Sequence, residues 1–498
     1  MINRASGILM HISSLASPFG IGDFGPEAYR FADFLHNSGQ SVWQVLPLTP
    51  TDPAHGSSPY SSASSAALSP WLLSPELMVE DGFLSDDDLS ELPAFETGEV
   101  NYEAVAKHKT VLLDKAFERF KNKADRTDFD HFCRENSYWL DDFALFMILK
   151  RKFNGMVWNL WPVEYRDRHD EALESARTEY SDRLLREKMI QYLCFSQWLN
   201  LKKYCNHKGI QLFGDIPIYV NFDSADVWKN PHIFKLSDDK HPTLVAGVPP
   251  DYFSETGQLW GNPVYNWDVL KQENYRWWIE RLSHNFKLYN MIRIDHFRGL
   301  VAYWEVPAGE ETAINGKWVK VPVRDFFDTI MKHFFLPPII AEDLGMITAD
   351  VREILKTYAF PGMKVMIFSF GADDPAHPYL PHNYEENYVA YTATHDNNTV
   401  RGWFDEEADD ETRARFFRYL GREVEAEQVH WEMIRLVMMS RAGLAMFPMQ
   451  DLLGLGSGSR TNRPSFGDGN WRWRILPDQI NDNITTKLAE MTRLYGRI

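Results

Sequence analysis

The segment Met291–Gly299 holds two residues of opposite charge whose spacing could support chemistry, Arg293 and Asp295. The segment begins as an apolar run, and side chains two residues apart lie on the same face of a strand. We therefore expect the guanidinium of Arg293 to keep the carboxylate of Asp295 ionised and oriented. A single pair of this kind is also the ordinary pattern of a structural ion pair, so its meaning depends on how other strands end.

Three further apolar runs end in polar residues, namely Asp215, then Glu342 with Asp343, then His395 with Asp396. If these runs are parallel strands of one barrel, their carboxyl ends meet at one mouth. Clustered carboxylates raise one another's pKa, so one can be a protonated acid while another, held by an arginine, stays anionic. Glycosyl transfer by a retaining route needs this division, because one carboxylate attacks the anomeric carbon and the other protonates the leaving oxygen.

A divalent metal site is the main alternative for a rim of carboxylates. Against it, Arg293, His296 and His395 place positive charge or hydrogen-bond donors where a cation would sit, and no H-E-x-x-H motif occurs. The glycine-rich loop Gly454–Arg460 lacks the lysine and the spacing of a phosphate-binding loop. We therefore expect no metal and no other cofactor.

The elements that must position these residues are eight short apolar runs, many of them separated by helical patterns. Such near-continuous hydrophobicity is typical of strands buried on both faces, and the alternation predicts an α/β fold, a (β/α)8 TIM barrel. Helices are expected from Pro26 to just before Gly39, over Glu187–His207 and over Ile484–Leu494. The predicted strands are Gly7–Ile12, Val42–Leu48, Ile210–Ile218, Met291–Phe297, Pro338–Gly345, Met363–Phe370, Tyr388–Asp396 and Leu444–Leu453.

Residues 1–498 are expected to form a single catalytic barrel with two long insertions in its βα loops. The first, about residues 70–185, has mostly helical patterns. The second, about residues 219–287, combines hydrogen-bonding and aromatic side chains, which suit sugar hydroxyls and C–H faces. Its candidate ligand-binding residues are Asp251, Glu255, Gln258 and Trp260, and Ser58 and Tyr60 lie just after the second strand.

The composition narrows the class of partner. Lys and Arg number 52 against 70 Asp and Glu, a net charge of −18, which argues against nucleic acid and anionic membranes as partners. The longest apolar run, Phe143–Leu149, is too short to span a bilayer. Three cysteines and no signal-peptide pattern favour a soluble, cytoplasmic protein. The oligomeric state stays open.

With these motifs in place, the chain resembles the 4-α-glucanotransferases (amylomaltase or disproportionating enzyme) of glycoside hydrolase family 77, in the α-amylase superfamily. The loop Asp251–Trp260 and the motif Gly469–Arg474 make the resemblance specific to this family. Relatives lack the C-terminal β-sandwich of α-amylases, and none is expected here. The resemblance is carried by Gly7–Gly25, Trp43–Tyr60, Phe213–Trp228, Gly247–Trp267, Arg293–Gly299, Ala341–Gly345, Thr394–Thr399 and Gln450–Arg474.

The resemblance implies that Asp295 is the nucleophile, Glu342 the general acid and base, and Asp396 a third carboxylate that stabilises the transition state. Some relatives have an aspartate directly after the sixth strand, where this chain has Gly371, and Asp373 is a possible substitute. The residues that would bind the glucan are Arg293, His395, His296, Tyr60, Ser58, Asp215, Asp251, Glu255, Gln258, Trp260 and Asn462.

The predicted function is a retaining 4-α-glucanotransferase that acts on α-1,4-glucans and maltooligosaccharides. It would move a glucan segment, through a covalent glycosyl-aspartate, to the 4-hydroxyl of an acceptor. A hydrolase of the α-amylase clan would share every catalytic residue and differ only in its acceptor. A barrel that binds glucan without catalysis is a second alternative, and the intact carboxylates Asp295, Glu342 and Asp396 speak against it.

Overall fold

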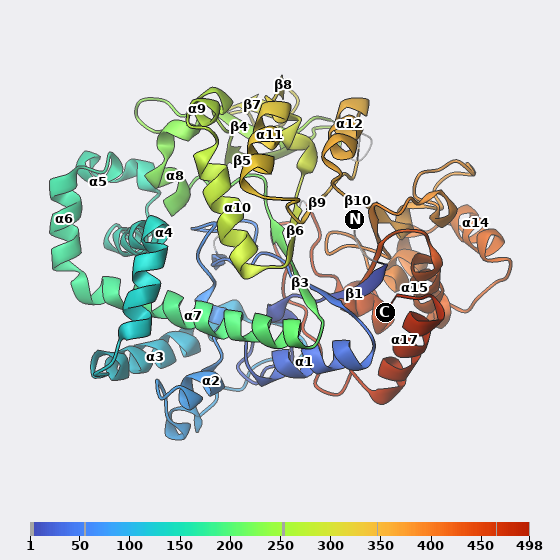
Figure 1. Ribbon diagram of the computed structural model, residues 1–498, viewed down its shortest axis with the longest axis horizontal. Helices are drawn as coiled ribbons and strands as arrows, with labels where there is room; N and C mark the ends of the chain where they lie inside the picture. The colour runs from blue at the N-terminus through green and yellow to red at the C-terminus, as the bar shows by residue number, and fades with distance from the viewer. Residues whose placement is uncertain (1–3, 54–55, 251–253, 346, 465, 498) are drawn as a thin grey trace.

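Eight parallel strands form the centre of the computed structural model (Figure 1), which describes residues 4–53, 56–250, 254–345, 347–464 and 466–497. The strands are β1 Ala5–Leu9, β2 Val42–Gln44, β3 Gln211–Ile216, β6 Met291–Ile294, β9 Ile339–Ala341, β10 Gly362–Val365, β11 Tyr388–Tyr391 and β12 Leu444–Pro448. Neighbours follow the order β10-β11-β12-β1-β2-β3-β6-β9 and pair in parallel. The predicted (β/α)8 barrel is confirmed, and its strand ends share one mouth.

The barrel closes between β9 and β10 through a seam that includes a side chain. The amide of Ala341 donates across it to the carbonyl of Pro361 at 2.8 Å. The amide of Met363 donates to a carboxylate oxygen of Asp343 at 2.6 Å. Asp343 is buried, and this burial raises its pKa to about 6. The side chain of Asp343 thus helps to close the barrel and is not part of the cluster of acids at the mouth.

Each strand ends earlier than its apolar run predicts. The run Met291–Phe297 is strand only as far as Ile294, and the run Tyr388–Asp396 only as far as Tyr391. The residues beyond stay apolar because the loops above the barrel bury them, although they have left the sheet; Ile218 is 2 % exposed. Asp295, Glu342 and Asp396 therefore lie on segments beyond the strand ends, whereas Asp215 is still part of β3.

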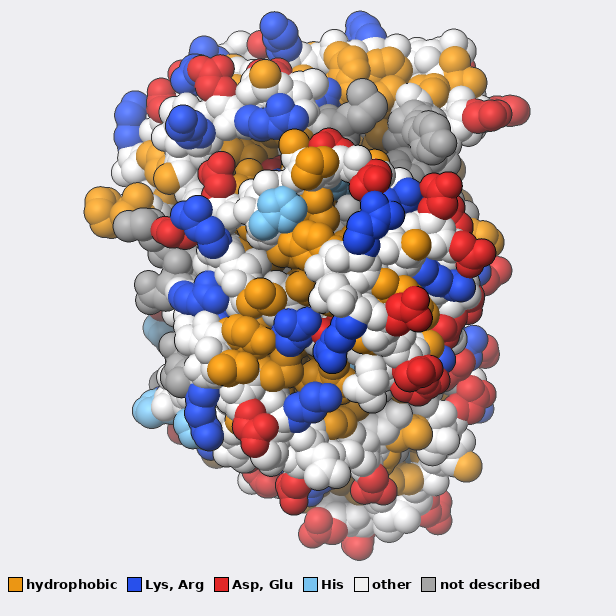
Figure 2. All heavy atoms as spheres, turned by 90° about the vertical axis from the view of Figure 1, so that its right-hand side faces the viewer, with side chains coloured by type: hydrophobic (Ala, Val, Ile, Leu, Met, Phe, Trp, Pro, Cys, Tyr) orange, Lys and Arg blue, Asp and Glu red, His pale blue; other side chains and the backbone are white. Residues whose placement is uncertain are grey.

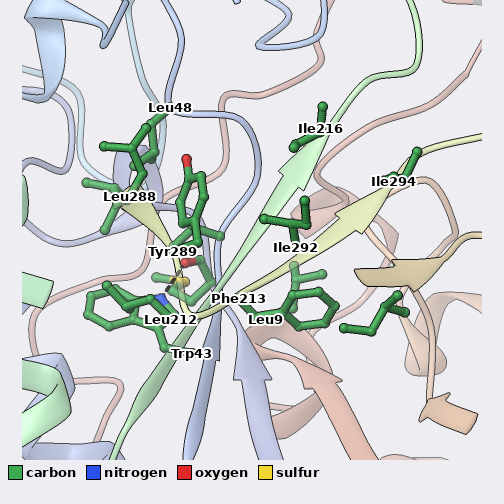
Figure 3. Close-up of a cluster of buried hydrophobic side chains, with 14 of the residues drawn as sticks. Leu9, Trp43, Leu48, Leu212, Phe213, Ile216, Leu288, Tyr289, Ile292 and Ile294 are labelled. Atoms are coloured by element: carbon green, nitrogen blue, oxygen red, sulfur yellow. Dashed lines mark hydrogen bonds between the residues drawn. The ribbon is translucent and has the colours of Figure 1, made fainter. Parts of the chain in front are cut away.

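Alternating side chains of β2 show how the barrel is filled. Trp43 is fully buried and faces outward, where it contacts Phe31 of helix α1 (Pro26–Asn37), with ring centroids 4.7 Å apart. The next residue, Gln44, faces the interior and accepts a hydrogen bond from Tyr391 of β11 at 2.9 Å. Figure 3 shows Trp43, Leu212 and Phe213 within one cluster of buried apolar side chains from neighbouring strands.

Helices surround the barrel, and the three helices expected from the sequence are present. They are α1 Pro26–Asn37, α7 Ser181–His207 and α17 Asp482–Leu494. Beyond β12 the described residues contain α16, the short 3-10 helix η12 Ser457–Ser459 and α17, and no strand. The remaining helices outside residues 70–185 are α8 Ala225–Lys229, α9 Trp267–Gln272, α10 Arg276–Leu288, α11 Val323–His333, α12 Ala349–Tyr358, α13 Val400–Gly402, α14 Asp410–Leu420, α15 Val429–Met439 and α16 Met449–Leu452.

Residues 70–185 form a helical layer at the left and bottom of Figure 1, beside α7. Its helices are α2 Pro75–Glu80, α3 Tyr102–Lys121, α4 Thr127–Lys152, α5 Val163–Arg166 and α6 Asp170–Glu179. A buried ion pair ties this layer to the loop after β1, because Lys109 of α3 lies 3.5 Å from Asp23. The Lys109 ammonium also donates to the carbonyls of Trp71 and Leu73, each at 2.7 Å.

A four-stranded antiparallel sheet at the top of Figure 1 has no counterpart in the sequence prediction. Its order is β5-β4-β7-β8, with β4 Leu244–Val248, β5 Gln258–Pro263, β7 Ala302–Pro307 and β8 Lys317–Lys320. Two strands come from before β6 and two from after it, so their pairing is invisible in any single stretch of sequence. Residues 219–287 thus contain only half of this sheet, and they end within α10.

Charged side chains of both signs are interspersed over the face shown in Figure 2, with hydrophobic side chains between them. Among the described residues, no helix is long and apolar enough to cross a membrane.

Replacing Lys109 by methionine tests the buried ion pair. Lys109→Met leaves the carboxylate of Asp23, which is 1 % exposed, without its cation. Removing one partner of a buried pair costs about 3–5 kcal/mol of unfolding free energy. Lys115→Met on the same helix is the matched control, because Lys115 pairs with Asp88 but is 45 % exposed, and such pairs contribute at most about 1 kcal/mol. Chemical denaturation of both variants measures the difference; equal losses would contradict the assignment.

Candidate active site

Three carboxylates occupy turns at the mouth of the barrel. Asp295 directly follows β6, Glu342 directly follows β9, and Asp396 lies five residues after the end of β11. The amide of Asp295 donates to the carbonyl of Ile216 at 2.9 Å, so this turn is tied to the end of the neighbouring strand β3. The barrel topology therefore brings together residues that are far apart in the chain.

The guanidinium of Arg293 bridges two of the acidic residues. One nitrogen donates to Asp215 at 2.6 Å, and another donates to Asp295 at 2.6 Å. The side chains of Arg293 and Asp215 are 4 % and 0 % exposed, whereas that of Asp295 is 30 % exposed. Burial alone would lower the pKa of Arg293, but the two carboxylates raise it well above its usual range. The arginine thus remains charged beside an accessible carboxylate.

Glu342 is surrounded by groups that act on its pKa in opposite directions. Its two carboxylate oxygens accept from the amides of His296 at 2.8 Å and Leu344 at 2.9 Å. Burial raises the pKa of Glu342 to about 7, against the lowering effect of Arg293. A group with this pKa can donate a proton near neutral pH and take one back.

His296 allows the chain to turn between these two acids. It adopts the left-handed conformation, with φ 50° and ψ 48°, which a residue with a side chain seldom adopts. This turn points its amide at Glu342 immediately after Asp295 has left the strand. Its ring packs edge-on to Trp260, with centroids 4.8 Å apart, and burial lowers its pKa to about 4.

Asp396 is held from several sides. Its oxygen Oδ1 accepts from the side-chain amide of Asn462 at 2.6 Å, and Oδ2 lies 3.3 Å from Nε2 of His395. Arg460 donates to the Asp396 carbonyl at 2.9 Å, and the amide of Asn462 donates to the His395 carbonyl at 3.0 Å. The loop after β12 therefore orients the loop after β11, and Asp396 keeps 39 % of its side chain exposed.

Tyr60 connects Asp215, the partner of Arg293, with His395, the neighbour of Asp396. Its hydroxyl donates to Asp215 at 2.6 Å and lies 2.9 Å from Nε2 of His395. Because the hydroxyl has one proton and gives it to Asp215, His395 is the donor in the second bond and carries its proton on Nε2. The two rings are stacked, with centroids 5.5 Å apart and planes 10° apart. Ser58 accepts a hydrogen bond from the amide of Tyr60 at 3.3 Å.

The residues expected from the loop before β6 are only partly near this network. Trp260 contacts His296, and its indole nitrogen donates to Gln258 at 3.1 Å. Glu255 is exposed on the turn between β4 and β5. Asp251 lies outside the described residues, so its predicted role stays a prediction.

Two further residues differ from what sequence reasoning suggested. Trp471 lies beside Tyr60 and His395, with ring centroids 5.7 and 6.0 Å away, and belongs to the site although it was not among the candidates. Its aromatic motif Gly469–Arg474 was the available signal. Asp373 is not part of the network, because its carboxylate is 75 % exposed and lies 3.4 Å from Arg418.

Among the residues that the structure describes, no group of three or more His, Cys, Asp or Glu side chains is arranged to hold a metal ion. The site offers a carboxylate hydrogen-bonded to an arginine, a carboxyl group whose pKa burial raises to about 7 and an exposed third carboxylate beside aromatic rings. This set suits displacement at the anomeric carbon of a sugar.

Comparison with known proteins agrees with this chemistry. A family model described as 4-alpha-glucanotransferase matches residues 10–479. The 4-alpha-glucanotransferase of Aquifex aeolicus is 48 % identical over 99 % of each chain, and that of Synechocystis is 46 % identical over 99 % of this chain and 98 % of its own. The structure of amylomaltase from Streptococcus agalactiae in complex with acarbose matches with a TM-score of 0.96, at 40 % identity over 99 % of each chain. The chain belongs to the 4-alpha-glucanotransferase family.

Proposed function

We propose that this protein is a retaining 4-α-glucanotransferase that disproportionates maltooligosaccharides by a double displacement at the anomeric carbon. The observation that carries the proposal is the pair of unlike acids around Arg293. Asp295 is bonded to the guanidinium and accessible, while burial raises the pKa of Glu342 to about 7. One acid is thus suited to attack and the other to protonate.

In the first step, a carboxylate oxygen of Asp295 attacks the anomeric carbon of the donor glucan. The bond from that carbon to the glycosidic oxygen breaks, and Glu342 gives its proton to the departing oxygen. In the second step, the 4-hydroxyl of an acceptor glucan attacks the glycosyl ester. Glu342 takes the hydroxyl proton and Asp295 leaves as a carboxylate, so two inversions retain the configuration.

The other polar groups act on the sugar. Asp396 is exposed and held by Asn462, so it can accept hydrogen bonds from sugar hydroxyls and stabilise positive charge on the ring. His395 and Tyr60 are oriented by their mutual hydrogen bond, and the Tyr60 ring offers a flat face to a pyranose. Arg293, Asp215 and His296 act mainly on the two acids.

Transfer rather than hydrolysis requires an acceptor site that excludes water. Trp260 and its partner Gln258, beside His296, supply an exposed ring for an acceptor sugar. Ser58, Glu255, Asp251 and the loop 454–462 would complete the glucan site. The acarbose complex of the Streptococcus agalactiae amylomaltase supports a glucan-like ligand.

We also infer a cytoplasmic location and a single catalytic unit whose insertions shape the glucan site. Cys133, Cys194 and Cys205 are all free thiols, which favours a reducing compartment. The net charge of −18 favours a neutral sugar over nucleic acid as partner.

Incubation with maltotriose separates the candidate functions. We expect glucose and longer maltooligosaccharides to accumulate together, with no net gain of reducing ends, because each bond broken is matched by one formed. Chromatography of products and a reducing-end assay measure this. A net gain would identify a hydrolase, and an unchanged substrate would identify a barrel that only binds glucan.

Asp295→Asn tests the nucleophile. We expect the transfer rate to fall at least about a thousandfold, because the amide cannot form the glycosyl ester. Asp373→Asn is the matched control, since this carboxylate is 75 % exposed and outside the network, and it should keep the unmodified rate. Retained activity in Asp295→Asn, measured with maltotriose, would refute the assignment.

The pKa of Glu342 sets the alkaline limit of the reaction. Glu342 must carry a proton to act as the acid, so kcat/KM for maltotriose should fall above a pH of about 7. The fluoride of α-maltosyl fluoride departs without being protonated. With this substrate the rate of the first step should therefore not change over that pH range, and it should be retained in Glu342→Gln.

Asp343→Asn is the control for this pH profile. Burial raises the pKa of Asp343 to about 6, and an asparagine can still accept from Met363. The alkaline limit should therefore stay in place in Asp343→Asn. If the alkaline limit disappeared in Asp343→Asn, it would belong to Asp343 and not to Glu342.

A further inference from the structure

A small cavity with both polar and apolar lining adjoins Asp215 and extends to α10; we call it the Asp215 cavity. It leaves about 30 Å³ for the centres of water molecules, which is room for about two at 10–15 Å³ each. Figure 3 shows Leu48, Leu288 and Tyr289, which form part of its apolar wall, lying close together. Its polar lining includes Tyr60, Asp215, Asn285 and Arg281.

Only one oxygen of Asp215 is satisfied by protein groups. Oδ2 accepts from both Arg293 and Tyr60, each at 2.6 Å. Oδ1 is buried, and no group in the described part of the chain donates to it. An ionised oxygen without a donor is costly in a protein interior. Burial raises the pKa of Asp215, so a donor on Oδ1 would help to keep it ionised.

Arg281, which lines the same cavity, has a buried hydrogen-bond donor without an acceptor in the residues that the structure describes. The residue is 6 % exposed, and two of its nitrogens donate to the carbonyls of Pro217 at 2.6 Å and Ile218 at 3.2 Å. These carbonyls belong to the turn that follows Asp215. The third nitrogen, Nε, is buried and is paired with no acceptor among the described residues. Burial lowers the pKa of Arg281, and the nearby Tyr265 and Asp226 raise it in part.

We propose that Arg281 is a positioning residue for the transfer reaction, joined to Oδ1 of Asp215 by two water molecules in the Asp215 cavity. The hydrogen bonds run in one direction. Nε–H donates to the first water, that water donates to the second, and the second donates to Oδ1. Arg281 then acts on the reaction through Asp215, which orients Arg293 and so the nucleophile Asp295.

This inference rests on the proposed function, and Arg281→Met tests it in the full-length protein. We expect kcat for maltotriose to fall about tenfold to a hundredfold through misplacement of Arg293, with little change in KM. Without the linked cation, Asp215 keeps its proton to higher pH, so the acidic limit of kcat should move upward. Arg281→Lys keeps the charge and a donor for water, and should restore part of both effects.

Arg497→Met is the matched control. Arg497 is likewise buried, but it donates only to carbonyls at the opposite end of the barrel, among them those of Ala5 and Met438. Its loss should lower the unfolding temperature without moving the pH profile. If Arg281→Met also lowered only the unfolding temperature and kept the profile of the unmodified protein, the proposal would be overturned.

A high-resolution crystal structure of the unmodified protein tests the cavity independently of activity. We expect ordered water within hydrogen-bond distance of Asp215 Oδ1 and of Arg281 Nε. A cavity without ordered water at these two atoms would refute the inference even if the enzyme transfers glucan. Conversely, a protein that leaves maltotriose unchanged would refute the proposed function whatever the cavity contains.

Discussion

The bridge that Arg293 makes between Asp215 and Asp295 is the interaction on which the rest of the site depends. A fully buried carboxylate on one side and an accessible one on the other share a single cation. The cation stays charged because both neighbours are acidic, and it therefore fixes the direction of Asp295. Glu342 lies close enough to feel that charge, but its burial is the larger effect. Asp295 and Glu342 consequently differ in burial and in hydrogen-bond partners, although they follow the neighbouring strands β6 and β9.

Much of this arrangement could be predicted from local sequence. The spacing of Arg293 and Asp295 implies a shared face, and the recurrence of acids at the ends of apolar runs implies a common mouth. Both patterns are short-range, and hydrophobic runs report strands buried on both faces reliably. The exact strand ends could not be predicted, since residues such as Ile218 are buried by overlying loops rather than by the sheet.

The parts that escaped prediction depend on contacts between distant segments. In the antiparallel sheet β4 pairs with β7, although β6 lies between them in the sequence. The sequence of neither strand indicates its partner. Trp471 reaches Tyr60 only because the loop after β12 folds back over the mouth. The unsatisfied nitrogen of Arg281 is likewise a property of packing, not of residue type. Resemblance to a family can name such residues, but only the fold explains why they meet.

At the seam between β9 and β10, one backbone amide hydrogen can report whether the barrel is open or closed. The amide of Met363 is bonded to the side chain of Asp343, the residue next to Glu342, rather than to the backbone of the adjacent strand. Opening of the barrel at this point would free that single hydrogen to exchange with solvent. One amide signal can therefore follow local opening of the barrel wall beside Glu342, without any label at the mouth of the barrel.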